Sequence, residues 1–124
     1  MVEQPNFEAL LVVVDGRIGR VTLNRPDKLN ALSRQLMSEI VELGAWLKLR
    51  EDIRVVILSG AGRSFSAGFD LNDFSSASAG ESPRIAADLG RLATNALTDV
   101  PQLTIAAVHG HCVGGGVVFV AACD

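Results

Sequence analysis

Two apolar stretches lie near the start of the chain. The segment EALLVVVDGRIGRVTLNRP has a largely apolar run on either side of Asp15-Gly16, a dipeptide that readily takes the positive φ angles of a tight turn. This pattern predicts two strands joined as a hairpin. The side chains expected to face the core are Val12, Val14, Val21 and Leu23.

The apolar pattern changes to a helical period after Pro26. Apolar residues recur at a spacing that stacks them on one side of a helix, and this predicts a helix from about Asn30 to Leu49. The stripe consists of Leu36, Ile40, Leu43 and Leu47. A second helix is predicted to begin with Ser82 as N-cap and Pro83 as first residue, after a polar surface loop from Ser75 to Ser82.

Two short apolar runs predict further strands. Residues 54–60 (RVVILSG) and 103–110 (LTIAAVHG) have the composition of strands that are buried on both faces. The second run leads into a triple glycine, Gly114 to Gly116, and then an apolar element without a readable period, which we expect to be a helix. Strands alternating with helices predict an α/β fold with parallel pairing.

Composition limits the size and the partners of the molecule. A chain of 124 residues that is 48% hydrophobic can form one domain and is too short for two ordinary ones. Its 14 acidic and 11 basic residues are interspersed, without the basic stripe of a nucleic-acid-binding protein. The two cysteines are too few for a disulfide framework, and no leader pattern opens the chain. We therefore expect a cytoplasmic protein with no nucleic-acid partner.

A membrane segment is an alternative for residues 103–123, which carry no charge and contain a GxxxG pair at Gly110 and Gly114. Against it stand two histidines and four glycines in the middle of the run and the lack of an aromatic belt. We therefore favour a protein without a membrane partner.

Two glycine-containing corners each follow a predicted buried strand. The first is Ser66-Ala67-Gly68 and the second is the triple glycine. Backbone N–H groups from two such corners could surround one oxygen that becomes negative during a reaction, but glycines at corners also serve tight turns alone. Spacing leaves both interpretations open. The nearby cluster of His109, His111 and Cys112 lacks further ligands at zinc spacing, so no metal site is expected.

Three motifs together resemble the enoyl-CoA hydratase/isomerase (crotonase) superfamily. They are LNRPDKLNAL, SGAGRSFSAGFDL and AAVHGHCVGGGVVFVAACD, in this order, and the resemblance covers roughly residues 7–124. It implies repeated ββα units wound as a superhelix, of which residues 1–124 would form a single domain that is incomplete at its C-terminus. It also implies assembly as a homotrimer or hexamer.

The resemblance implies a site for an acyl-CoA thioester. The N–H groups of Ala67 and Gly115 would bind the thioester carbonyl oxygen and stabilise the enolate that forms from it. Coenzyme A would then be part of the substrate, and no tightly bound cofactor is expected. The implied binding residues are Ser66, Phe69, Asp70 and Leu71 along the acyl-pantetheine channel, Lys28 and Leu29 at the adenine end, and His111 and Val118 at the pocket.

One position departs from the family pattern. Hydratases of this superfamily carry a glutamate that helps to activate water where this chain has Val118, and a valine cannot transfer a proton. Double-bond isomerisation is therefore expected to be favoured over hydration, and a non-catalytic acyl-CoA-binding homologue is the alternative. Asp70 is expected to order its own loop by accepting backbone N–H bonds rather than to act as a base.

Overall fold

Four strands form one sheet in the order β1-β2-β3-β4 in the computed structural model, which describes residues 3–75 and 83–124. The first two strands are antiparallel, and the other two neighbouring pairs are parallel. The strands are β1 (Leu10–Asp15), β2 (Ile18–Leu23), β3 (Val55–Gly60) and β4 (Leu103–Ala106). The predicted α/β class with parallel pairing is confirmed.

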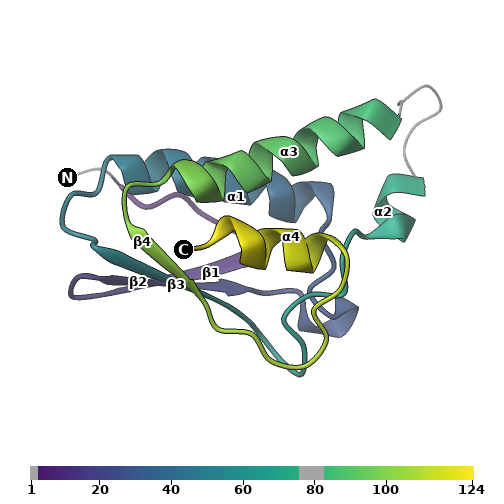
Figure 1. Cartoon of the computed structure of the whole chain (residues 1–124), viewed down its shortest axis with the longest axis horizontal. Coiled ribbons are helices and arrows are strands. Elements are labelled where there is room, and N and C mark those ends of the chain that lie inside the picture. The colour runs from purple at the N-terminus through teal and green to yellow at the C-terminus, as the bar shows by residue number, and fades with distance from the viewer. Residues whose placement is uncertain (1–2, 76–82) are drawn as a thin grey trace.

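The helical elements are the 3-10 turn η1 (Pro26–Lys28), α1 (Arg34–Lys48), α2 (Leu71–Ser75), α3 (Pro83–Asp99) and α4 (Gly115–Ala122). Helix α1 connects β2 to β3, helices α2 and α3 connect β3 to β4, and α4 follows β4. Figure 1 shows α1, α3 and α4 on the same side of the sheet. The second helix begins at Pro83 as predicted, whereas the proposed cap Ser82 and the surface loop beyond Ser75 lie outside the described residues.

Helix α1 supplies more buried core residues than any other described element, but it begins later than predicted. Its N-cap is Ser33, whose Oγ accepts the Leu36 N–H at 3.1 Å. Leu29 and Asn30 have φ angles of 53° and 54°, which a right-handed helix cannot include, and the predicted start at Asn30 is therefore wrong. The predicted stripe is buried throughout: Leu36, Ile40, Leu43 and Leu47.

The hairpin turn lies one residue later than predicted. Asp15 pairs with Ile18 as the last residue of β1, so the turn consists of Gly16 and Arg17. Gly16 has a φ of +59°, a conformation that side chains disfavour. The predicted inward positions of the hairpin are buried at Val12, Val21 and Leu23 and partly buried at Val14.

Strands β3 and β4 are not buried on both faces, and that prediction is wrong. In β3, Val56 is buried while Ile57 is only partly covered. In β4, Leu103 and Ile105 are 51% and 46% exposed on either side of the buried Thr104. The reason is that α1, α3 and α4 all lie over one face of the sheet, which leaves alternate side chains of the strands on the other face.

The uncharged stretch 103–123 is divided among a strand, a loop and a helix. β4 takes its first four residues and α4 covers eight residues near its end. The apolar element after the triple glycine is thus a helix, as predicted. Over the described parts of the chain, no helix is long and apolar enough to cross a membrane.

Candidate functional site

The two glycine-containing corners lie against each other. Ser66 donates its N–H to the His111 carbonyl at 3.0 Å and accepts the Val113 N–H at 3.1 Å. At Gly68, where φ is +94°, an added Cβ would lie 3.0 Å from the Val113 carbonyl oxygen and 3.6 Å from the Gly115 nitrogen. Only a residue without a side chain allows this approach. The fold therefore brings the two corners into contact, although 46 positions separate Gly68 from Gly114 in the sequence.

The backbone N–H groups of the two corners differ in their partners. The Ala67 N–H is occupied, because it donates to the Leu29 carbonyl at 2.9 Å. Phe69 pairs with Leu32 in a parallel bridge, which is formed by the Gly68 carbonyl and the Asp70 N–H. The N–H of Phe69 therefore points away from Leu32. Within the described part of the chain, the N–H groups of Phe69 and Gly115 donate no hydrogen bond.

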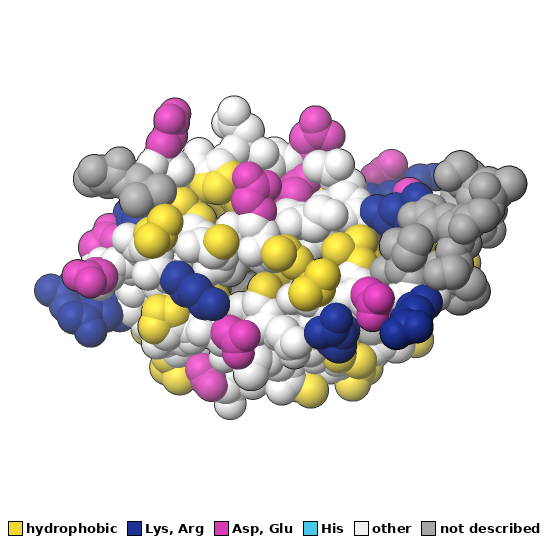
Figure 2. Space-filling model, turned by 90° about the horizontal axis from the view of Figure 1, so that it is seen from above, with side chains coloured by type: hydrophobic (Ala, Val, Ile, Leu, Met, Phe, Trp, Pro, Cys, Tyr) yellow, Lys and Arg dark blue, Asp and Glu magenta, His cyan; other side chains and the backbone are white. Residues whose placement is uncertain are grey.

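An apolar pocket of about 410 Å³ borders these two residues, within the range of small-molecule sites. Its lining residues are Leu32, Phe69, Ala87, Gly90, Arg91, Thr94, Gly115, Val118 and Phe119. Of the predicted site residues, Phe69, Gly115 and Val118 therefore meet at one pocket. Figure 2, which views the helix side of the molecule, shows hydrophobic side chains gathered along its middle with charged side chains around them.

The ring of Phe69 is held between two glycines. A Cβ added at Gly90 in α3 would lie 3.3 Å from the Phe69 ring, and one added at Gly115 in α4 would lie 3.5 Å from it. The ring also makes an edge-to-face contact with Phe74, with centroids 6.2 Å apart. The two glycines thus leave room for the Phe69 ring, which forms one wall of the pocket.

A second hollow of about 370 Å³ lies before the amino end of β3, around Ile53, Arg54 and Gln102. It includes none of the predicted site residues. The pocket beside the glycine corners is therefore the better candidate for the functional site.

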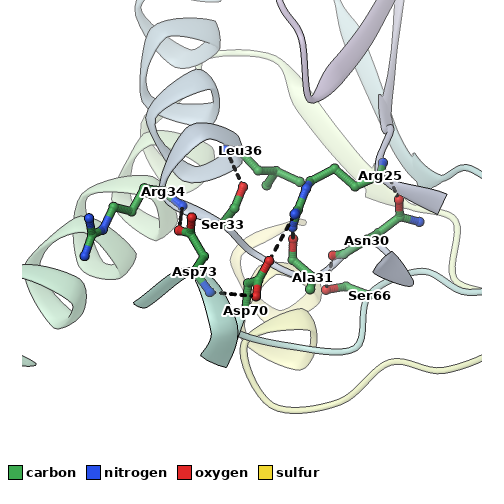
Figure 3. A network of polar contacts seen from close by, with 9 residues as sticks. All are labelled: Arg25, Asn30, Ala31, Ser33, Arg34, Leu36, Ser66, Asp70 and Asp73. Atoms are coloured by element: carbon green, nitrogen blue, oxygen red, sulfur yellow. Dashed lines mark hydrogen bonds and ion pairs between the residues drawn. The ribbon is translucent and has the colours of Figure 1, made fainter. Parts of the chain in front are cut away.

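Asn30 fixes the segment that approaches the first corner, and sequence reasoning missed it. Its fully buried side chain donates to the carbonyls of Ala61 and Ser64 at 2.9 and 2.8 Å and accepts the Arg25 N–H at 2.8 Å. Its carbonyl accepts the Ser66 hydroxyl at 2.8 Å (Figure 3). The available signal was an asparagine just before a helix, since asparagine tolerates the left-handed conformation better than most residues.

Asp70 orders its loop, as predicted. One carboxylate oxygen accepts the Asp73 N–H at 3.0 Å, at the start of α2, and the other pairs with Arg25 at 3.0 Å (Figure 3). The Asp73 N–H and the Arg25 guanidinium hold the pKa of Asp70 below its ordinary value. A carboxylate held in its charged form by these partners is a weak proton acceptor, which suits a structural role.

The sequence itself decides the family. Residues 14–124 match the sequence profile described as enoyl-CoA hydratase/isomerase. The chain belongs to the enoyl-CoA hydratase/isomerase family. The mitochondrial Delta(3,5)-Delta(2,4)-dienoyl-CoA isomerase of Mus musculus is 37% identical over 134 residues, covering 99% of this chain and 41% of that protein. The probable enoyl-CoA hydratase echA8 of Mycobacterium bovis is 36% identical, covering 95% of this chain and 45% of that protein.

Solved structures agree with this assignment. A putative enoyl-CoA hydratase from Streptomyces coelicolor superimposes with a TM-score of 0.87 at 32% identity, covering all of this chain and 46% of the other. An enoyl-CoA hydratase from Bacillus anthracis gives a TM-score of 0.88 at 32% identity and 46% coverage of that chain. The predicted crotonase-like fold is confirmed. This chain spans less than half the length of these relatives.

The remaining residues implied by the family resemblance lie outside the pocket lining. Lys28 is exposed at the end of η1 and is followed by Leu29, while Leu71 is 77% exposed at the start of α2. Ser66 is buried behind the first corner, and His111 is exposed in the loop before the triple glycine. Among the described residues there is no group of three or more histidine, cysteine, aspartate or glutamate side chains that could hold a metal ion.

Proposed function

We propose that this chain carries the oxyanion hole and the acyl pocket of an acyl-CoA-processing enzyme. The observation that supports this most is the contact of the two glycine corners at an apolar pocket. A Cβ added at Gly68 would lie 3.0 Å from the Val113 carbonyl oxygen and 3.6 Å from the Gly115 nitrogen, and the pocket begins at Gly115, where an added Cβ would lie 2.7 Å from the Leu32 side chain. Such a contact suits a site where backbone groups, rather than side chains, meet the reacting atoms.

The two donors that we propose are the N–H groups of Gly115 and Phe69. The family resemblance points to Ala67 in place of Phe69, but the Ala67 N–H donates to Leu29, and it would have to lose that bond to act. Phe69 and Gly115 both line the pocket, and both N–H groups are unused by the described residues. A preorganised donor that needs no rearrangement stabilises a developing charge more effectively.

These donors would act on the thioester carbonyl oxygen of an acyl-CoA. When a proton leaves the α-carbon, electron density moves onto that oxygen, and two N–H groups stabilise the resulting enolate more strongly than the neutral thioester. Removal of one such donor typically lowers the rate by about 10²- to 10³-fold. Coenzyme A is part of the substrate in this scheme, and no tightly bound cofactor takes part.

The rest of the CoA molecule would extend along the surface outside the pocket. Lys28 and Leu29 would contact its adenine end, and the segment from Ser66 to Leu71 would line the pantetheine channel, with His111 nearby. Lys28 is an exposed cation, which suits an anionic ligand. A homotrimer or hexamer is the assembly that we propose for the full enzyme.

The reaction class depends on Val118. This residue lines the pocket at the position where the family resemblance implies a glutamate in hydratases, and a valine cannot transfer a proton. We therefore propose isomerisation of an enoyl-CoA double bond ahead of hydration. A non-catalytic acyl-CoA-binding protein remains the second candidate, because the same Val118 removes one proton-transfer group from the site.

The compartment stays a prediction. The relative from Mus musculus is named as mitochondrial and one from Arabidopsis thaliana as peroxisomal, whereas the composition of this chain favours the cytoplasm.

The test replaces single backbone amides by esters, which removes one N–H and keeps the side chain. Esters at Gly115 and at Phe69 should each lower the rate of 3-enoyl-CoA isomerisation by about 10²- to 10³-fold, and an ester at Ala67 should not. Hydration of a short 2-enoyl-CoA should be slower than isomerisation in the unmodified protein. An unchanged isomerisation rate with the Gly115 ester would refute the proposed oxyanion hole. A lower rate with the Ala67 ester and an unchanged rate with the Phe69 ester would show that Ala67, rather than Phe69, is the second donor.

A further inference from the structure

One face of α3 forms a wall of the pocket. Ala87, Gly90, Arg91 and Thr94 follow each other at helical spacing and all line the pocket. Thr94 uses its hydroxyl hydrogen within the helix, because Oγ donates to the Gly90 carbonyl at 2.8 Å. The other lining residues from outside α3 are apolar or glycine, so Arg91 is the one ionisable side chain among them.

The guanidinium of Arg91 has unused N–H donors. Its partner within the described residues is Asp88, at 3.8 Å along the same helix, and both side chains are more than half exposed. A long contact between exposed groups is a weak one. An arginine presents five N–H donors in a planar fork that matches both oxygens of a carboxylate, and Asp88 leaves most of them unused.

We propose that the pocket selects an acyl group whose far end carries a carboxylate, and that Arg91 binds this carboxylate. The inference rests on the proposed function, because it assumes that the thioester lies at Gly115. A dicarboxylic acyl-CoA would place its methylene chain along Leu32, Phe119 and the Phe69 ring and its terminal carboxylate at α3. The apolar lining leaves Arg91 as the group that distinguishes such a ligand from a simple alkyl thioester.

Another anion competes for the same arginine. Coenzyme A carries phosphates, and Arg91 would serve them if the CoA part rather than the acyl part lay along α3. The two arrangements differ in one measurable respect. If Arg91 binds the phosphates, its loss weakens every CoA thioester equally, whereas a role in acyl selection affects only the thioester with a terminal carboxylate.

The experiment measures the dissociation constants of two thioesters with the same chain length, adipoyl-CoA and hexanoyl-CoA. The unmodified protein should bind adipoyl-CoA about two- to fivefold more tightly than hexanoyl-CoA, the range of one exposed ion pair. Arg91→Leu should abolish this preference and leave hexanoyl-CoA binding unchanged, and Arg91→Glu should reverse it. Arg54→Leu, which removes an exposed charge at the amino end of β3, is the matched control and should keep the preference.

The outcomes separate the two proposals. Equal weakening of both thioesters by Arg91→Leu would assign the arginine to the CoA phosphates and overturn the selection of a carboxylate. Binding of both thioesters without a preference in the unmodified protein would also overturn it, while the proposed function would stand. Failure of both thioesters to bind more tightly than free coenzyme A would overturn both proposals.

Discussion

At the scale of single residues, polar side chains with several partners each join separate segments of the chain. Asn30 joins three segments, Asp70 links Arg25 to the start of α2, and the buried Glu39 accepts N–H groups of the chain entering β1, including that of Ala9 at 2.9 Å. Buried polar groups of this kind are costly to leave unpaired. The geometry of the first corner therefore depends on residues that do not line the pocket.

Replacing Asn30 by alanine should strongly destabilise the protein. The change leaves the buried carbonyl of Ser64 and the partly buried carbonyl of Ala61 without their donor. It also removes the side-chain hydrogen bonds that offset the left-handed φ of 54° at this position. We expect a loss of about 2–4 kcal/mol in the free energy of unfolding, measured by urea denaturation. Asn24→Ala is the control, because Asn24 is exposed, and an equal effect of the two changes would contradict this role for Asn30.

The Asp70 network should make stability depend on pH in the acid range. Because the folded-state pKa of Asp70 lies below its unfolded value, the charged carboxylate stabilises the fold above about pH 4, and this contribution is lost as the pH falls through the folded-state pKa. Thermal unfolding of the unmodified protein and of Asp70→Asn should differ at neutral pH and converge in acid. A difference that persists unchanged at low pH would show that the carboxylate charge is not the cause.

At the scale of elements, the sequence predicted whether a segment is a helix or a strand better than it predicted where the segment begins and how deeply it is buried. The period of α1 and the glycine-led α4 were predictable because they depend on local spacing. The start of α1 was not, since Leu29 and Asn30 adopt left-handed angles through tertiary hydrogen bonds. Burial of β3 and β4 was overestimated, because an apolar run does not reveal whether one or both of its faces are covered.

The packing of α1 on α3 gives a test at this scale. A Cβ added at Gly44 would lie 3.0 Å from the Ala96 Cβ and 3.1 Å from its carbonyl oxygen. Alanine normally favours a helix over glycine by about 1 kcal/mol, but overpacking costs about 1–3 kcal/mol. We therefore expect Gly44→Ala to lower the urea midpoint. Ala45→Gly, at the exposed neighbouring position, shows the propensity effect alone, and a higher midpoint for Gly44→Ala would contradict the tight contact.

At the scale of the whole molecule, the sheet has one face without a described cover. Val13, Arg20, Ile57 and Ile105 follow each other across the sheet through the strand register, and Val13 and Ile105 are nearly half exposed. Helix α4 also exposes apolar side chains, since Val117 and Val118 are 51% and 47% exposed. Spacing alone left the pairing of the two glycine corners open, and our proposal of Phe69 in place of Ala67 depends on the Ala67 N–H being bonded to Leu29, which the sequence does not reveal.

This uncovered face should make the isolated 124-residue chain self-associate. Contiguous exposed apolar surface is unusual in a soluble monomer. Sedimentation should show species larger than a monomer, together with binding of a hydrophobic dye. The double change Leu103→Lys and Ile105→Lys should reduce both, since these side chains are exposed and their replacement leaves the core intact. A monomer that binds no dye would contradict the expectation.

The central claim is that backbone N–H groups of the two corners bind a thioester carbonyl, and the vibration of that carbonyl tests it most directly. Two hydrogen bonds from Phe69 and Gly115 would polarise the C=O bond of bound hexanoyl-CoA labelled with ¹³C at the carbonyl. Its infrared stretching band should lie at a lower frequency than in water, and the shift should shrink when the Gly115 amide is replaced by an ester. A band at or above its frequency in water, with ligand demonstrably bound, would contradict the account.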